Sequence, residues 1–422
     1  MIVIRADANR EIGTGHVMRC LSIAAALKKL GQQVCFLTAD QGAAALLQAK
    51  GQAYRVLDSD YRNLEGELAI LERFFSEGQL CFIGTDESCQ GSEPCQGSEP
   101  CREGEPCQGS EPCREGEPCQ ESRSAQRDEG GRKGSLAADF FLADSYFVTA
   151  EYFRKVREWM PVGYLDDKCL TGFPLDMLIN YNIFAEASSY KETDARLLLG
   201  TEYAPLREEF INIPYNVREK ASRVLVTTGG SDRYGLAGRF VERALADART
   251  ADLEYCIVSG VYNVHLEELL ALEKRHPNVK IRSNVSHMHR LMQESDMAVT
   301  AGGSTMYELS AVGVPMACFS FVDNQERIVE GFARRGLVCF GGNYLTQGEA
   351  MLDEAVEGIA RLAADAGLRA EYSRKLRGLV DGQGAMRIAR QIAGQIAGQI
   401  CQGSSVKPEN PVNGTYHIEA ER

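Results

Sequence analysis

The chain has 422 residues, of which 44% are hydrophobic and 25% are charged, and its formal net charge is −13. This length suffices for two domains of ~100–200 residues each. The acidic balance argues against a nucleic-acid-binding protein, because phosphate binding requires a basic surface. No apolar run approaches the ~18 residues of a membrane helix, and the first residues lack the pattern of a secretory signal. We therefore expect a cytoplasmic, monomeric enzyme without nucleic-acid or membrane partners.

The first half of the chain alternates between apolar runs of strand length and segments with helical spacing of apolar residues. We expect strands at 1–4, 33–38, 54–57, 139–144, 162–165 and 178–182, and helices at 17–30, 42–50, 64–75 and 149–159. Such alternation predicts a parallel sheet with right-handed crossovers. Residues 197–210 are predicted to be a loop that leads from this first domain, residues 1–210, to a second one.

A glycine-rich turn, Gly13-Thr-Gly15, separates the first predicted strand from the first predicted helix, and His16 follows it. Backbone N–H groups at a helix start favour an anion. The same positive helix end disfavours protonation of an imidazole, so we expect His16 to be neutral near pH 7, as a general base requires. The alternatives are a capping or packed histidine, because strand–Gly-x-Gly–helix turns are common in α/β proteins.

A hexapeptide repeat interrupts this pattern. Its five units are Cys-Gln-Gly-Ser-Glu-Pro or Cys-Arg-Glu-Gly-Glu-Pro, and a decayed sixth unit begins at Cys119. Together they hold six of the fourteen cysteines, from Cys89 to Cys119. A stretch with so few apolar side chains cannot offset an ordering cost of ~1–2 kcal/mol per residue. We predict a disordered insertion at 86–137. A β-helix would need an aliphatic residue in each rung, and a zinc site would favour Cys-x2-Cys pairs. The other eight cysteines are expected to be reduced, buried small hydrophobes.

The second half repeats the alternation of strands and helices. We expect strands at 223–228, 255–259, 279–282, 297–300 and 315–319, and helices at 236–248, 351–364 and over most of 368–400. The predicted domains are therefore 1–210 and 211–400, followed by a flexible tail at 401–422. The predicted fold class is α/β, with two doubly wound Rossmann-like domains. Because open parallel sheets bind ligands at the carboxyl ends of their strands, we expect a cleft between the domains.

A second motif, Gly302-Gly-Ser-Thr305, follows the predicted strand at 297–300, and a helix is expected to begin near Ser304. Backbone N–H groups and two hydroxyls at that point suit a diphosphate. Glu308 lies one turn deeper on the same helix face, where a carboxylate can accept from both hydroxyls of a ribose. Plain N-capping and a capping box are the alternatives. With Asn324 and Gln325 later in the chain, we favour nucleotide binding.

Gly302-Gly-Ser-Thr-x-x-Glu308 with Gly-Val-Pro315 resembles the nucleotide-binding end of GT-B glycosyltransferases, notably the peptidoglycan N-acetylglucosaminyltransferase. Arg5-Ala-Asp7 with Gly13-Thr-Gly-His16-x2-Arg-Cys20 resembles more specifically the UDP-2,4-diacetamido-2,4,6-trideoxy-β-L-altropyranose hydrolases of pseudaminic acid biosynthesis. Further matching segments are Asp144-Ser-Tyr146, Asp166-Asp167, Leu198-Leu-Gly200, Tyr203, Leu206-Arg207, Thr228-Gly-Gly-Ser-Asp232 and Asp323-Asn-Gln325. The resemblance extends over nearly the whole chain except the insertion and the tail.

The resemblance implies hydrolysis of a UDP-linked diacetamido-trideoxy sugar. Water would attack the anomeric carbon, the C–O bond would break and UDP would leave, with His16 as the base and with no metal or other cofactor. The alternative is a GT-B glycosyltransferase that uses a UDP-sugar donor. A third hypothesis is a non-catalytic interaction protein whose working part is the repeat.

The same resemblance suggests roles for individual residues. Gly13, Gly15, Ser304 and Thr305 are expected to face the diphosphate, Glu308 the ribose, Met288 the uracil, and Asn324 and Gln325 the sugar. Gly230, Arg5, Asp7 and Arg207 are further substrate-binding candidates, and the three charged ones could instead form structural salt bridges. His287 and His289 could hold a metal, but no third ligand lies nearby in the sequence, so we expect no metal site.

Overall fold

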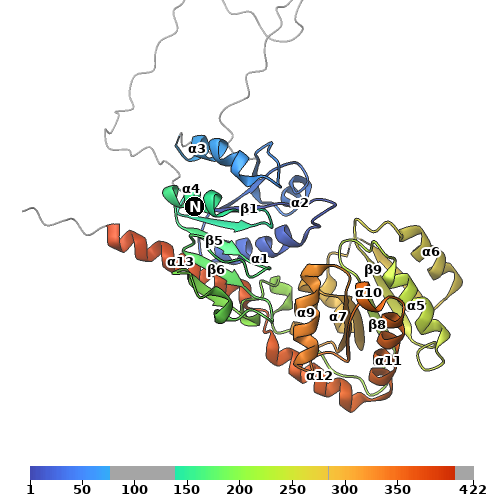
Figure 1. The fold of residues 1–422 in the computed structure, drawn as a ribbon. Helices are drawn as coiled ribbons and strands as arrows, with labels where there is room; N and C mark the ends of the chain where they lie inside the picture. The colour runs from blue at the N-terminus through green and yellow to red at the C-terminus, as the bar shows by residue number, and fades with distance from the viewer. Residues whose placement is uncertain (77–137, 284, 404–422) are drawn as a thin grey trace, which may run out of the picture.

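The computed structural model describes residues 1–76, 138–283 and 285–403, and these form two α/β halves (Figure 1). The predicted insertion at 86–137 and residues 404–422 of the predicted tail lie outside the described residues. The predicted class of two doubly wound parallel-sheet domains is confirmed. Among the described residues, no helix combines the length and the apolar character needed to cross a bilayer.

The first half is built on a parallel sheet whose strand order within the described residues is β3-β2-β1-β4-β5-β6-β7. The strands are β1 (Ile2–Ala6), β2 (Val34–Thr38), β3 (Ala53–Val56), β4 (Phe140–Asp144), β5 (Val162–Leu165), β6 (Met177–Asn180) and β7 (Arg196–Leu199). Strand β1 is central and every residue in it is buried, because helices cover both faces of the sheet. Ile4 pairs with Phe36 on one side and with Leu142 on the other.

The helices of the first half lie where the periodicity predicts them. They are α1 (Gly15–Lys29), α2 (Ala44–Ala49), α3 (Leu68–Ser76) and α4 (Ala150–Trp159), with short 3-10 turns η1 (Leu64–Glu67), η3 (Ala187–Tyr190), η4 (Thr201–Tyr203) and η5 (Glu208–Phe210). Helix α4 begins after Thr149, whose hydroxyl accepts from the N–H of Tyr152.

The second half holds a parallel sheet with the order β10-β9-β8-β11-β12-β13 in the described residues. Its strands are β8 (Arg223–Thr227), β9 (Glu254–Ser259), β10 (Val279–Ser283), β11 (Met297–Ala301), β12 (Met316–Ser320) and β13 (Phe340–Asn343). Its helices are α5 (Leu236–Ala246), α6 (Leu266–Arg275), α7 (Met288–Glu294), α8 (Ser304–Val312), α9 (Asp323–Arg334), α10 (Tyr344–Gln347), α11 (Ala350–Ala364) and α12 (Ala366–Leu379).

Two details of this half differ from the prediction. Strand β13 was not expected, because Phe340-Gly-Gly-Asn343 contains two glycines and has little intrinsic strand preference; it forms by pairing with β12. The long helix predicted at 368–400 is divided at Gly382, which has a φ of +77° and therefore cannot continue a right-handed helix. In the first half, the predicted loop at 197–210 contains three of the four residues of β7, which forms by pairing with β6.

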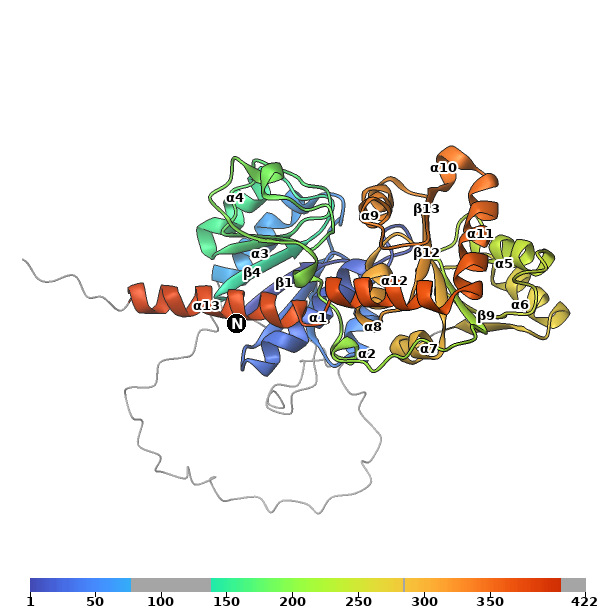
Figure 2. The ribbon, with the colours of Figure 1, turned by 90° about the horizontal axis from the view of Figure 1, so that it is seen from below.

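The last described helix, α13 (Gly384–Gly403), returns to the first half and packs against α1 (Figure 2). A side chain at Gly384 would place its Cβ 2.2 Å from the carbonyl oxygen of Ala204, so glycine permits the close approach of α13 to the connection between the halves. The predicted domain boundaries assigned residues 211–400 to one unit. The apolar stripe of α13, which includes Ile388 and Ile392, is buried in a core that contains Leu27 of α1 and also Met306 of α8.

The two halves are also joined by a buried tyrosine. The hydroxyl of Tyr307 in α8 accepts from the backbone N–H of Ile183 at 3.1 Å and donates to Oδ1 of Asn182 at 3.2 Å. Asn182 and Ile183 follow β6 of the first half. This hydroxyl therefore connects helix α8 of the second half to the segment that follows β6 in the first half.

Tyr307→Phe is expected to lower the free energy of unfolding by about 1–3 kcal/mol, because it leaves two buried polar groups without a partner. Urea denaturation would measure the change. Tyr372→Phe on α12 is the matched control. The contact of Tyr372 with Lys375 is made by the face of the ring, and phenylalanine keeps that ring. Equal stability of the two variants would contradict a connecting role for Tyr307.

Candidate functional site

A cleft of about 190 Å³ opens between the two halves. Its walls come from the carboxyl ends of β1, β4, β5 and β6 in the first sheet and of β11 and β12 in the second. The lining residues are Ile12, Gly15, His16, Arg19, Tyr146, Asp167, Tyr181, Asn182, Gly302, Gly303, Ser304, Asn324, Gln325 and Ile328. Strands β1 and β4 are neighbours in the sheet although they are distant in sequence, and such a reversal of strand order is where doubly wound sheets bind ligands.

His16 stands in the first turn of α1, at one wall of this cleft. The turn before it is held by Asn9, whose side-chain oxygen accepts from the N–H groups of Glu11 and Ile12, and Gly13 takes a φ of +71° there. The His16 side chain is only 4% exposed, and its ring meets the ring of Tyr146 edge to face at 4.4 Å. This packing fixes the orientation of the imidazole.

Asp144, the last residue of β4, orients His16 from below. Its Oδ1 lies 2.5 Å from Nδ1 of His16, so the ring is held through Nδ1 and Nε2 is the nitrogen left for chemistry. Burial would raise the pKa of the Asp144 carboxyl, but the adjacent Arg19 guanidinium and His16 outweigh it and hold that pKa well below its usual range. Asp144 is therefore a carboxylate at neutral pH, and a carboxylate stabilises a proton on the imidazole.

Arg19 completes this buried network. Its guanidinium donates to both oxygens of Asp144, at 2.6 and 2.5 Å, and to Oδ2 of Asp167 at 2.6 Å. Two carboxylates and one guanidinium leave a net negative charge of one beside His16.

Tyr146 reaches across the cleft. Its hydroxyl accepts from Nδ2 of Asn324 in the second half at 3.1 Å. Burial raises the pKa of Tyr146 to about 12, so the phenol keeps its proton at neutral pH. This hydrogen bond holds the two walls of the cleft together on the side of His16.

The second half contributes two helix starts to the cleft. Gly302, Gly303 and Ser304 lie at the start of α8, and Asn324 and Gln325 at the start of α9. Gly303 has a φ of +155°, which disfavours other residues, and a Cβ on Gly302 would lie 2.9 Å from Cβ of Gln325. With α1, three helix N-termini therefore converge on one cavity, and their unpaired N–H groups and positive ends suit a diphosphate.

The other predicted binding residues lie outside the cleft lining. Glu308 forms an ion pair with Arg207, whose Nη2 lies 3.2 Å from Oε1 of the carboxylate. Burial raises the pKa of Glu308, and Arg207 partly offsets that effect. Met288 is buried at the start of α7, and Thr305 is partly exposed beside Ser304. Gly13 and Gly230 stand in the turns after β1 and β8, with nothing within 4 Å of a Cβ built on them.

For Arg5 and Asp7 the sequence allowed either substrate binding or structural salt bridges. In the structure they form salt bridges, and neither residue lines the cleft. Both are buried. Nη1 of Arg5 donates to Asp7 at 2.5 Å, and Nε of Arg5 donates to Glu67 at 2.9 Å. Asp7 also accepts from the backbone N–H of Ala39 at 2.7 Å, and Tyr152 donates to Glu67 at 2.7 Å. The guanidinium is fully paired inside the first half, so it is not available to a substrate.

Glu67→Leu is expected to lower the free energy of unfolding by about 3–5 kcal/mol, because it leaves the buried Arg5 charge without its main partner. Affinity for a cleft ligand should not change. Chemical denaturation and ligand titration would measure the two quantities. Glu158→Gln, at an exposed i,i+3 pair with Lys155, is the control and should cost less than ~1 kcal/mol. If Glu67→Leu is as stable as this control, then Glu67 is not the main partner of the buried Arg5 charge.

Four residues that surround His16 were not predicted as site residues: Asp144, Arg19, Tyr146 and Asp167. Two signals were present. All four residues lie in segments that carry the family resemblance, and Asp144 ends a predicted strand at 139–144, where the carboxyl ends of parallel strands collect binding residues. Nothing in the spacing connects Asp144 to His16, which precedes it by 128 residues.

The expectation of no metal site rested on the lack of a third ligand near His287 and His289 in the sequence. The structure brings Glu209 beside both histidines, with one possible ligand atom from each residue within 4.8 Å of the others. This cluster lies outside the cleft lining.

Sequence comparisons give partial matches. No protein-family model matches the chain. The chain is 28% identical over 218 residues to the spore coat polysaccharide biosynthesis protein SpsG of Bacillus subtilis. The aligned segment covers 50% of this chain and 63% of that protein. The chain is also 26% identical over 164 residues to the UDP-2,4-diacetamido-2,4,6-trideoxy-β-L-altropyranose hydrolase of Campylobacter jejuni. That aligned segment covers 38% of this chain and 58% of the hydrolase. These matches span less than two thirds of the relatives' lengths.

Solved structures match over nearly the whole chain. MurG of Acinetobacter baumannii superposes with a TM-score of 0.56 at 15% identity, covering 93% of this chain and 99% of that one. The calicheamicin glycosyltransferase CalG4 gives a TM-score of 0.56 at 14% identity, with coverages of 94% and 98%. Staphylococcus aureus MnaA, solved with UDP, gives 0.55 at 11% identity, with coverages of 94% and 96%. The chain therefore has the two-domain GT-B fold of glycosyltransferases.

Proposed function

We propose that this protein transfers the sugar of a UDP-sugar to an acceptor hydroxyl in the cleft between its halves, with His16 as the general base. The observation that carries the proposal is the pairing of His16 with Asp144 opposite the start of α8. One wall thus holds a proton acceptor, and the other holds the N–H groups that suit a diphosphate. The GT-B fold of two structurally similar glycosyltransferases supports the same reaction class.

The reaction assigns a task to each wall. Nε2 of His16 takes the proton of the acceptor hydroxyl while its oxygen attacks the anomeric carbon. The bond from that carbon to the phosphate oxygen breaks, and UDP leaves with the electron pair. Asp144 stabilises the imidazolium that forms, and the start of α8 at Gly303 and Ser304 stabilises the charge on the departing diphosphate.

The remaining predicted contacts belong to this proposal. Ser304, Thr305, Gly13 and Gly15 would face the diphosphate. Glu308 would hold the ribose, Met288 the uracil through its backbone, and Asn324 and Gln325 the sugar. Gly230 would contribute an open turn beside the nucleotide. Arg207 would act on the ribose through its ion pair with Glu308.

Hydrolysis is the second candidate, and one observation favours it. The C. jejuni relative, 26% identical over 164 residues, is a UDP-sugar hydrolase. The same His16–Asp144 pair would then take a proton from water instead of from an acceptor hydroxyl. The substrate would be the UDP-linked diacetamido-trideoxy sugar of that relative. The structural neighbours favour transfer, so we give hydrolysis second place.

Coupled measurement of UDP release separates the two reactions. The protein is incubated with UDP-N-acetylglucosamine and with the UDP-diacetamido-trideoxy sugar, each with and without a panel of hydroxyl-bearing acceptors. Release that depends on an acceptor supports transfer, and release without any acceptor supports hydrolysis. If neither sugar nucleotide is bound or cleaved under any of these conditions, the proposal fails.

A further inference from the structure

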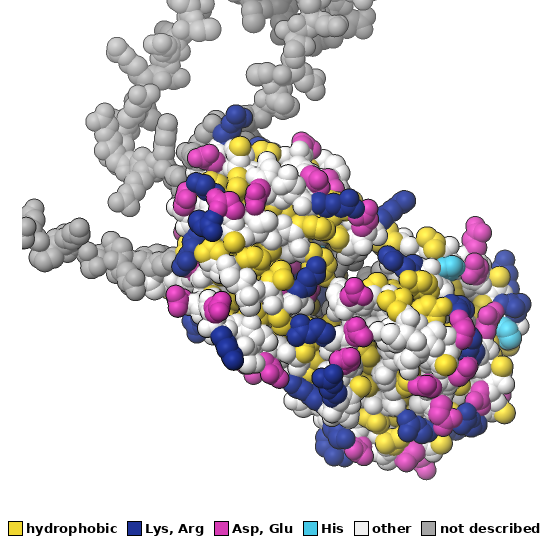
Figure 3. Space-filling view, in the orientation of Figure 1, with side chains coloured by type: hydrophobic (Ala, Val, Ile, Leu, Met, Phe, Trp, Pro, Cys, Tyr) yellow, Lys and Arg dark blue, Asp and Glu magenta, His cyan; other side chains and the backbone are white. Residues whose placement is uncertain are grey.

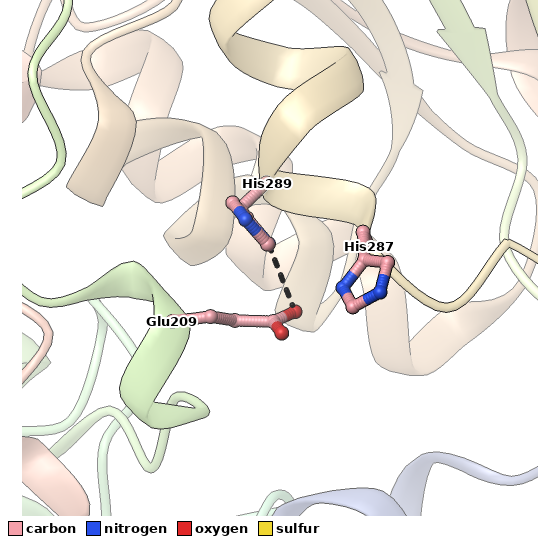
Figure 4. A group of neighbouring side chains, drawn as sticks. All are labelled: Glu209, His287 and His289. Atoms are coloured by element: carbon pink, nitrogen blue, oxygen red, sulfur yellow. Dashed lines mark ion pairs between the residues drawn. The ribbon is translucent and has the colours of Figure 1, made fainter.

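A second polar cluster joins the connection between the halves to the nucleotide-binding half. Glu209 lies in η5, His289 lies in the first turn of α7, and His287 immediately precedes that helix (Figure 4). Nδ1 of His289 is 3.4 Å from Oε1 of Glu209, and the two imidazole rings are 5.8 Å apart. In Figure 4 the three side chains converge on one point from two separate segments.

The contacts inside this cluster are incomplete. Nδ1 of His289 and Oε1 of Glu209 are both buried atoms, and within the described part of the chain neither has a hydrogen-bond partner. Nη1 of Arg207 is 2.9 Å from Oε1 as an ion pair, without hydrogen-bond alignment. Buried polar atoms are usually paired. A bound cation would satisfy both atoms at once.

The spacing is that of two ligands on one metal ion. Zinc binds histidine nitrogen at about 2.0–2.1 Å and carboxylate oxygen at about 2.0–2.2 Å, so two ligands of a tetrahedral zinc lie about 3.3–3.5 Å apart. The observed separation between His289 and Glu209 is 3.4 Å. His287 is exposed, so its ring can turn to supply the third nitrogen.

We propose that Glu209, His287 and His289 form a site for a divalent transition metal of the zinc type. Two imidazoles and one carboxylate suit zinc. The exposed side of His287 leaves a fourth position for water. A carboxylate has lone pairs for more than one partner, so Arg207 can remain beside Glu209 and hold it in place. The metal would tie η5 to α7, on either side of Met288, and its binding to the free protein does not require that the proposed sugar chemistry is correct.

Metal titration of the full chain tests the site. The probes are zinc and cobalt(II) salts, added alone after accessible thiols have been alkylated, because the chain has 14 cysteines that could bind the same ions. We expect one equivalent of metal per chain and a cobalt visible spectrum without thiolate bands. His289→Ala and Glu209→Gln should each weaken binding by at least ~10-fold. His276→Ala, which changes the histidine after α6, is the matched control and should bind as the unmodified sequence does.

Circular dichroism identifies any variant that fails to fold, and Glu209→Gln keeps the shape of the side chain if His289→Ala is unstable. Stoichiometric binding that is lost in the folded cluster variant and kept in His276→Ala supports the site. Binding of the same strength in all three variants overturns it. So does the absence of a stoichiometric equivalent in the alkylated protein.

Discussion

Replacing His16 with alanine is expected to lower the kcat of UDP release by about 10²–10⁴-fold, the usual contribution of a general base. The UDP dissociation constant should stay close to its original value, because the proposed contacts to the diphosphate come from the helix starts and not from the His16 imidazole. Steady-state kinetics and calorimetric titration with UDP would measure the two quantities. His16→Phe should give the same result, because it keeps the ring packing against Tyr146 without a nitrogen.

His265→Ala is the matched control for this prediction. His265 precedes α6 and lies outside the cleft lining. Its Nδ1 is 3.0 Å from Oε2 of Glu268. Its kcat should equal that of the unmodified protein. The base assignment is wrong if His16→Ala keeps full turnover. It is also wrong if UDP affinity falls in proportion to kcat, since His16 would then be a binding residue only.

Asp144→Asn is expected to reduce both turnover and stability. An amide cannot stabilise the imidazolium as a carboxylate does, so kcat should fall with little change in UDP affinity. The same change leaves the buried Arg19 charge without its bidentate partner, and we expect a loss of about 3–5 kcal/mol in the free energy of unfolding near neutral pH. Urea denaturation and steady-state kinetics would test both effects.

The stability effect of Asp144 has a defined pH dependence. Because its pKa is lowered in the folded protein, the carboxylate's contribution is fully present above the unfolded value of about 3.9 and is lost as pH falls through the lower folded value. The difference between the original sequence and Asp144→Asn should therefore be constant from pH 7 to about 5 and shrink below about pH 4.

A surface carboxylate gives the control for this effect. Asp381 pairs with Arg387 and its side chain is 44% exposed. Asp381→Asn should cost less than ~1 kcal/mol at any pH. If Asp144→Asn is as stable and as active as Asp381→Asn, then Asp144 neither anchors Arg19 nor supports His16.

Local patterns were enough to predict most of the fold. The fully buried and mostly apolar β1 and the helical spacing of α1 follow directly from the residues in them, and the alternation of such segments implies parallel sheets. The errors arose where a distant partner decides the structure. Strand β13 exists because β12 pairs with it, and α13 lies on the first half because α1 offers an apolar surface.

The candidate site shows the same division. His16 and Ser304 stand in short motifs at helix starts, so their places could be predicted from the sequence. Asp144 could not be connected with His16, because that contact depends on β4 lying beside β1. Glu209 was missed as a neighbour of His289 for a similar reason: the two residues come from segments that only the folded chain brings together.

Neither sign of charge dominates the face of the described residues that is shown in Figure 3. On the face shown in Figure 3, lysine and arginine side chains of the described residues are interspersed with aspartate and glutamate side chains. Charge on this face is therefore locally balanced, and the net charge of −13 is a property of the whole chain. The charges that would act on a ligand lie in the cleft. There the starts of α1, α8 and α9 lie near the His16–Asp144–Arg19 network.

The central claim is that one cleft holds both the nucleotide and the base. A crystal structure of the protein with UDP tests this claim most directly. We predict the diphosphate within hydrogen-bond distance of the backbone N–H groups of Gly303 and Ser304, with Nε2 of His16 facing the end of the diphosphate that would carry the sugar. UDP bound elsewhere, or a His16 ring turned away from the bound diphosphate, would contradict it.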